Sequence, residues 1–124
     1  MSRKKPTLIR SFRHALRGVG EVFITERSMR IHTLVALIAV ALIAWLDLNK
    51  EASALIIFAI GAVITTEVIN TAIEKLLDHI HPEEHDAVRF IKDAMAGAVL
   101  VSSLAALSIG IVLVLPELIK RLTP

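Results

Sequence analysis

Three long apolar stretches, separated by short polar segments, dominate the pattern of the chain. The third stretch, 94–116, contains no charged residue, and the first, 31–46, contains none either. The middle stretch, 52–73, contains a single acid, Glu67. A helix needs about 20 predominantly apolar residues to cross the hydrocarbon core of a membrane. The pattern therefore predicts transmembrane helices at about 30–47, 52–77 and 92–116.

A further helix is predicted before these stretches, at about 7–25. Apolar residues recur in it at every third or fourth position, as in an amphipathic helix. They include Leu8, Phe12, Leu16, Val19 and Phe23. Much of the other side carries Arg10, Arg13 and Arg17. Such a helix lies on a membrane surface with its arginines toward anionic headgroups, so we expect a surface helix here.

The composition agrees with one membrane domain that comprises residues 1–124. A chain of 124 residues is enough for a single domain. Apolar residues make up 55% of it and the mean hydropathy is +0.68, which is too apolar for an ordinary soluble domain. The chain has no cysteine, which excludes disulfides, thiolate nucleophiles and cysteine zinc sites. The predicted fold class is an all-α membrane protein with a surface helix and three transmembrane helices.

Basic residues concentrate near the N-terminus, although the net charge is only +2. The block is short and leads straight into apolar stretches, so we expect no nucleic acid as a partner. Cytoplasmic segments of membrane proteins carry an excess of lysine and arginine. We therefore expect a multi-pass protein of the cytoplasmic membrane, with its N-terminus and the segment near Lys75, Arg89 and Lys92 on the cytoplasmic side. The N-terminal basic residues are Arg3, Lys4, Lys5, Arg10, Arg13 and Arg17.

An acidic stripe follows the second apolar stretch. At about 100° per residue, Glu67, Glu74 and Asp78 lie within about 20° of one direction on a helix, and Asn70 lies within about 60° of it. Ionised groups at membrane depth are costly unless they meet a cation, a partner or a water-filled cleft. The stripe therefore indicates a functional site at the edge of the membrane.

The chemistry of this stripe has more than one reading. In an antiparallel bundle, Glu26, just before the first span, and Lys92–Asp93, just before the third, would converge on it. Carboxylates with a lysine suit a Mg²⁺–nucleotide site, although the chain has neither a Walker loop nor a G-x-G-x-x-G loop. The same stripe could conduct protons or cations. It could also form structural ion pairs with Lys75 or Lys92.

Several motifs resemble the bacterial family of small integral-membrane diacylglycerol kinases. The segment E-V-I-N-T-A-I-E-K-L-L-D at 67–78 is followed by K-D at 92–93 and by A-G-A-V-L at 96–100. The resemblance implies a homotrimer with three transmembrane helices and a surface helix in each subunit. It also implies active sites between subunits at the cytoplasmic face, where the γ-phosphate of Mg-ATP passes to the hydroxyl of a membrane lipid.

The resemblance also implies roles for individual residues. Glu67 matches the general base of the family, and Glu26 and Glu74 match its Mg²⁺ ligands. Asn70 and Arg30 match residues that contact the substrate or shape the site. The matches to nucleotide-binding residues are Lys92, Asp93, His85, Arg17 and Asp78.

The lipid expected from the resemblance is undecaprenol. The segments M-R-I-H at 29–32 and A-G-A-V-L at 96–100 resemble the undecaprenol kinase branch of the family. The alternative within the family is a diacylglycerol kinase that makes phosphatidic acid at the same site. The alternative outside it is a small non-catalytic carrier of cations or protons.

Overall fold

The computed structural model describes residues 7–83 and 85–123, and within them every regular element is a helix. The all-α prediction is confirmed, and three of the four helices are long and apolar enough to cross a membrane. The basic residues at positions 3–5 lie outside the described part of the chain. The helices are α1 (Leu8–Thr25), α2 (Arg27–Leu46), α3 (Lys50–Ile80) and α4 (Asp86–Leu122).

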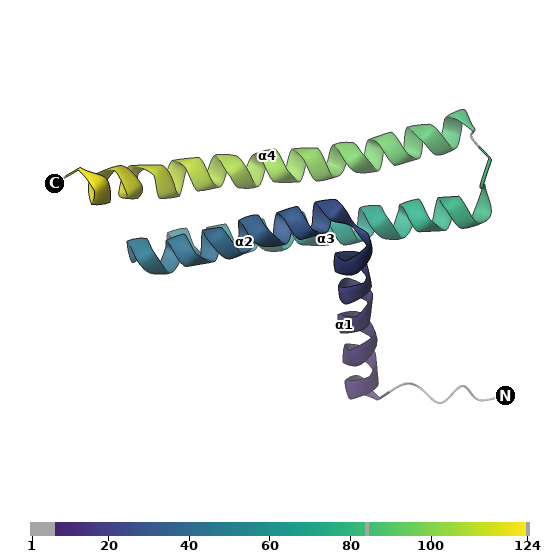
Figure 1. Cartoon of the computed structure of the whole chain (residues 1–124), viewed down its shortest axis with the longest axis horizontal. Helices are drawn as coiled ribbons and strands as arrows, with labels where there is room; N and C mark the ends of the chain where they lie inside the picture. The colour runs from purple at the N-terminus through teal and green to yellow at the C-terminus, as the bar shows by residue number, and fades with distance from the viewer. Residues whose placement is uncertain (1–6, 84, 124) are drawn as a thin grey trace.

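The three membrane-spanning helices run side by side, and α1 projects away from them (Figure 1). Helix α3 is antiparallel to both α2 and α4, so the start of α2 and the end of α4 point toward opposite ends of the bundle (Figure 1). With 31 and 37 residues, α3 and α4 are about 46 and about 56 Å long. Both exceed a hydrocarbon core of about 30 Å. The charged C-terminal end of α3 and the charged N-terminal end of α4 therefore extend beyond the apolar layer. The connection between the two helices brings these two ends together.

Helix α4 is longer than the pattern predicts at both of its ends. It begins at Asp86, before position 92, and it continues through Pro116 to Leu122. The predicted boundary at 116 concerned the membrane span, and the helix itself continues beyond it with Pro116 inside. Proline lacks a backbone donor, and the turn after it contains an exposed ion pair of 2.7 Å between Lys120 and Glu117. A helix in a membrane tolerates such a proline where neighbouring groups support the chain.

The buried face of α3 changes character along its length. Near the N-terminus of the helix, Ile56, Ala59 and Val63 are buried. The same face then continues with two buried polar residues, Glu67 and Thr71, each 2% exposed. A charged residue is almost never fully buried without a partner. The packing of α3 therefore places a carboxylate inside the helix bundle, where its contacts decide what it can do.

The start of α3 offers a direct test of its capping. Asn49 precedes the helix, and its side-chain oxygen accepts a hydrogen bond of 2.8 Å from the backbone N–H of Ala52. We expect Asn49→Ala to lower the free energy of unfolding by about 1 kcal/mol, because this N–H loses its acceptor. Unfolding of the detergent-solubilised protein by a titrated denaturant measures the change. Asn49→Asp restores the acceptor and should show little loss; an equal loss in both variants would contradict the assignment.

Candidate active site

Glu67 lies between α3 and α2, where two side chains of α2 contact its carboxylate. The hydroxyl of Ser28 donates a hydrogen bond to Oε1, and Nε2 of His32 lies 3.9 Å from Oε2. The glutamate side chain is 3% exposed. Among the described residues, no lysine or arginine forms an ion pair with Glu67. This carboxylate is thus hydrogen-bonded to a serine, and a histidine lies close to its second oxygen.

Sequence analysis did not predict Ser28 and His32 as site residues. They are one helical turn apart, so they face the same side of α2. That spacing was visible in the sequence, but nothing in it indicated which face of α2 meets α3. The packing of the two helices supplies that information.

A polar cavity of about 190 Å³ lies between α3 and α4. It brings together four of the predicted site residues, Asn70 and Glu74 from α3 and Lys92 and Asp93 from α4. Asp78 is beside it, since its Oδ1 lies 2.5 Å from Nζ of Lys92. Residues far apart in the sequence therefore form one cluster where the charged ends of α3 and α4 leave the apolar layer.

Glu67 is not part of the lining of this cavity, but it is on the same helix. Asn70 is about one turn further along α3, and Glu74 is about two turns further. The acidic stripe is therefore divided in the folded chain: Glu67 faces α2, and Asn70 and Glu74 face α4.

Besides Glu67 and Asp78, four predicted site residues do not line the polar cavity. Glu26 joins α1 to α2, and its Oε1 lies 3.6 Å from Nζ of Lys75. Arg30 donates a hydrogen bond of 2.8 Å to the carbonyl of Ile24, which ties α2 to the end of α1. The remaining two have local contacts: Arg17 pairs with Glu21 at 2.9 Å, and His85 caps the start of α4 through the backbone N–H of Ala87 at 3.3 Å.

The residues around the polar cavity fit a magnesium ion that arrives with a nucleotide. In the described part of the chain, no three His, Asp or Glu side chains are grouped to hold a metal by themselves. Mg²⁺ bound together with phosphates needs only one or two protein carboxylates, because phosphate oxygens and water complete its shell. Glu74, one of the two predicted Mg²⁺ ligands, lines this cavity with Asp93 and Lys92, whereas Glu26, the other predicted ligand, lies at the junction of α1 and α2.

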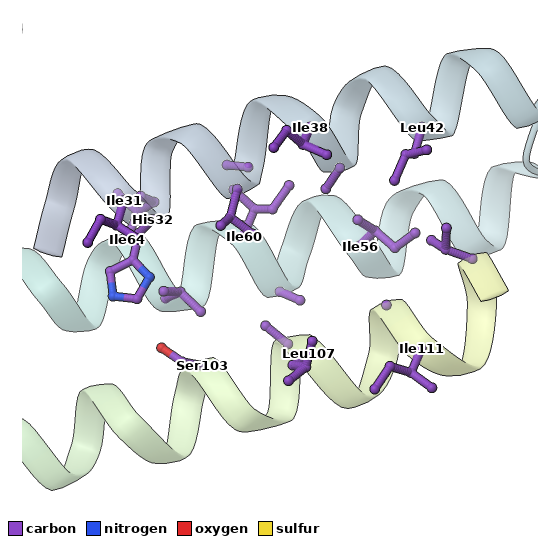
Figure 2. A pocket seen from close by; sticks show the side chains of 18 of the residues that line it. Ile31, His32, Ile38, Leu42, Ile56, Ile60, Ile64, Ser103, Leu107 and Ile111 are labelled. Carbon is purple, nitrogen blue, oxygen red and sulfur yellow. The ribbon is translucent and has the colours of Figure 1, made fainter. Parts of the chain in front are cut away.

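A second, larger cavity of about 550 Å³ lies among α2, α3 and α4 (Figure 2). Its lining is apolar apart from two side chains, His32 and Ser103. Figure 2 shows both at the same end of the cavity, with Ile111 and Leu42 toward the other end. Within the part of the chain that the structure describes, the buried hydroxyl oxygen of Ser103 has no hydrogen-bond partner. The polar end of an otherwise apolar cavity is therefore next to Glu67, because His32 contacts both.

These features define the class of the protein. Phosphoryl transfer asks mainly for positioning and for neutralisation of charge, which carboxylates, an amide and a lysine around a cavity can supply. The cluster is at the end of an apolar bundle that also contains a long apolar cavity. The fold is that of an integral-membrane protein, and the residues at the polar cavity are of the kinds that phosphoryl transfer uses.

Comparison with known proteins gives the particular family. The sequence model of the prokaryotic diacylglycerol kinase family matches residues 13–114. The chain belongs to this family, which is a family of lipid kinases.

Three relatives illustrate its range. A diacylglycerol kinase of Synechocystis sp. is 36% identical over 93% of this chain, which spans 66% of that protein, slightly less than two thirds of its length. An undecaprenol kinase of Bacillus subtilis is 34% identical over 88% of this chain and 89% of its own length. A diacylglycerol kinase of Escherichia coli is 29% identical over 80% of this chain and 81% of its own length.

Proposed function

We propose that this protein transfers the γ-phosphate of Mg-ATP to the hydroxyl group of undecaprenol. The observation that carries the proposal is the polar cavity, because it combines Lys92, Glu74, Asp93 and Asn70 one to two turns from a buried glutamate. A phosphate can bind on one side of this arrangement and a lipid alcohol on the other. A carrier of ions has no need of a lysine in such a cluster.

Each residue has a role in the proposed reaction. Lys92 contacts the phosphates as a point charge, and Asp93 and Asn70 shape the cavity around them. Glu74 and Glu26 would hold Mg²⁺, which neutralises charge on the transferred group when it is bound. Arg17, His85 and Asp78 are the further nucleotide contacts, and Arg30 shapes the site through its bond to α1.

Glu67 acts as the general base. As the alcohol oxygen attacks the γ-phosphorus, its proton passes to the Glu67 carboxylate. The new O–P bond forms while the bond between the γ-phosphorus and the bridging oxygen of ADP breaks. The products are a lipid phosphate, ADP and a proton that leaves Glu67 to solvent.

The large cavity supports a long hydrocarbon substrate. A prenyl chain can lie among the apolar side chains while its hydroxyl is at the polar end formed by His32 and Ser103. Among the described residues, the buried Ser103 hydroxyl has no hydrogen-bond partner, and the hydroxyl of the lipid would supply one. Of the three relatives described above, one is named an undecaprenol kinase and two are named diacylglycerol kinases. Undecaprenol is the proposed substrate, and diacylglycerol is the alternative at the same site.

The proposal includes an arrangement in the membrane. The ends of the helices around the polar cavity carry Lys75, Arg89 and Lys92, which supports a cytoplasmic site. Helix α1 would lie on the same surface, with its exposed Leu8, Phe12 and other apolar residues toward lipid. The exposed apolar surface of α4, which has no buried residue, is consistent with contact to lipid or to other subunits of a homotrimer.

A phosphorylation assay with two lipids tests the function. The purified protein is supplied with Mg-ATP and with undecaprenol or diacylglycerol in matched mixed micelles, and each lipid phosphate is quantified. We expect undecaprenyl phosphate to form at least 10-fold faster, since about 1.4 kcal/mol of differential binding gives that ratio. A preference for diacylglycerol would overturn the choice of lipid and leave the site assignment in place. No product from either lipid would overturn the kinase function and favour an ion carrier.

A further inference from the structure

The two oxygens of the Glu67 carboxylate have different surroundings. Oε1 accepts the hydrogen bond from the Ser28 hydroxyl. Oε2 faces His32, whose Nε2 is 3.9 Å away, beyond the reach of a direct hydrogen bond. Both contacts come from one face of α2, one helical turn apart. The carboxylate is therefore engaged at one oxygen and spaced from its neighbour at the other.

We infer that Ser28 and His32 orient the two reacting groups at Glu67. Ser28 fixes the carboxylate through Oε1, and His32 positions the lipid hydroxyl next to Oε2. Ser28 is then a positioning residue, and His32 is a specificity residue for the alcohol. The inference rests on the proposed function, because it assigns Glu67 the role of the base.

The role of Ser28 follows from the burial of Glu67. A buried carboxylate requires hydrogen bonds, and a neutral hydroxyl supplies one without adding a charge that would compete for the proton. The bond also fixes the rotation of the carboxylate about its last bond. With Oε1 engaged, Oε2 is the oxygen left to accept the proton of the substrate. A misplacement of a reacting group by about 1 Å can reduce a rate by about 100-fold.

The role of His32 follows from its second contact. The same side chain lines the large apolar cavity, where it forms the polar end with Ser103. At a separation of 3.9 Å, one oxygen to the side of the two atoms can lie within hydrogen-bond distance of both Nε2 and Oε2. A lipid hydroxyl at this lateral position can donate to Oε2 of Glu67 and accept from the imidazole N–H of His32. An alcohol whose chain lies in the cavity would arrive at Oε2 from this side.

Steady-state kinetics test the serine. We expect Ser28→Ala to lower kcat by about 10- to 100-fold with an unchanged KM for ATP, because the base is misoriented while the nucleotide site is intact. Ser28→Thr keeps the hydroxyl and should restore most of kcat, which loss of packing alone would not predict. Ser108→Ala is the matched control, since the Ser108 hydroxyl donates to the carbonyl of Leu104 within its own helix, α4. Wild-type kcat in Ser28→Ala, or equal losses in both variants, would overturn the role.

The histidine is tested through the lipid. We expect His32→Phe to raise KM for the lipid and to lower kcat/KM for the lipid by about 10-fold, with KM for ATP unchanged, since about 1.4 kcal/mol of contact with the alcohol is lost. His32→Gln keeps a donor and should lose less, and His14→Phe on exposed α1 is the control. Wild-type lipid kinetics in His32→Phe would overturn the assignment. An inactive wild-type protein would instead overturn the proposed function itself, so the two failures are distinguishable.

Discussion

Replacing Glu67 by glutamine is expected to reduce the rate of lipid phosphorylation by about 100- to 10,000-fold, the range typical of a lost general base. Glutamine has nearly the same shape and can still accept the hydrogen bond of Ser28 through its carbonyl oxygen. It does not take up a proton from the attacking alcohol. The effect should therefore appear in kcat, measured as lipid phosphate formed per enzyme at saturating ATP.

The control for this variant is Glu51→Gln. Glu51 is exposed in the first turn of α3, at the opposite end of the same helix, so the substitution is chemically identical and far from the site. Both variants should unfold at similar denaturant concentrations, because the buried neutral amide has a hydroxyl partner. A Glu67→Gln protein with more than a third of wild-type kcat would exclude Glu67 as the base. If the rate falls only as far as the folded fraction of the protein falls, Glu67 would have a structural role and no catalytic one.

Lys92→Met is the second large effect that we expect. Lys92 lines the polar cavity with Glu74 and Asp93, where its charge would stabilise the phosphoryl group in transfer. Loss of such a donor should lower kcat by about 100- to 1,000-fold and raise KM for ATP, as judged from initial rates over a range of ATP concentrations. A catalytic role of Lys92 predicts a large loss of kcat, whereas a structural role predicts only a small loss of stability. The pair of Lys92 with Asp78 is partly exposed, at 35% and 58%, so its contribution to stability is at most about 1 kcal/mol.

The matched control is Lys120→Met. Lys120 also forms an ion pair with a carboxylate of its own chain, Glu117 at 2.7 Å, but at the far end of α4. It should keep wild-type kinetics and lose a similar small amount of stability. Should Lys92→Met retain wild-type kcat and KM for ATP, the lysine would be a structural partner of Asp78 and the phosphate site would have to be elsewhere.

Much of the architecture was predictable because it depends on local composition. A stretch such as 94–116, without any charge, is stable only in an apolar environment, and a helix satisfies its backbone groups there. The acidic stripe was predictable for a similar reason, since helical periodicity alone puts Glu67, Glu74 and Asp78 near one face. The end of α4 was not predictable in this way. Whether a membrane helix tolerates a proline depends on the groups that surround it in the folded protein, and α4 continues through Pro116 to Leu122.

What the sequence by itself determined is therefore the set of helices, their membrane character and the residues able to do chemistry. The tertiary structure decided which of those residues meet. It placed Glu67 against Ser28 and His32 of α2, and it gathered Glu74 with Lys92 at the α3–α4 interface. The physical reason is that periodicity sets the direction of a side chain on its own helix, whereas its partner depends on how two helices are rotated and shifted against each other.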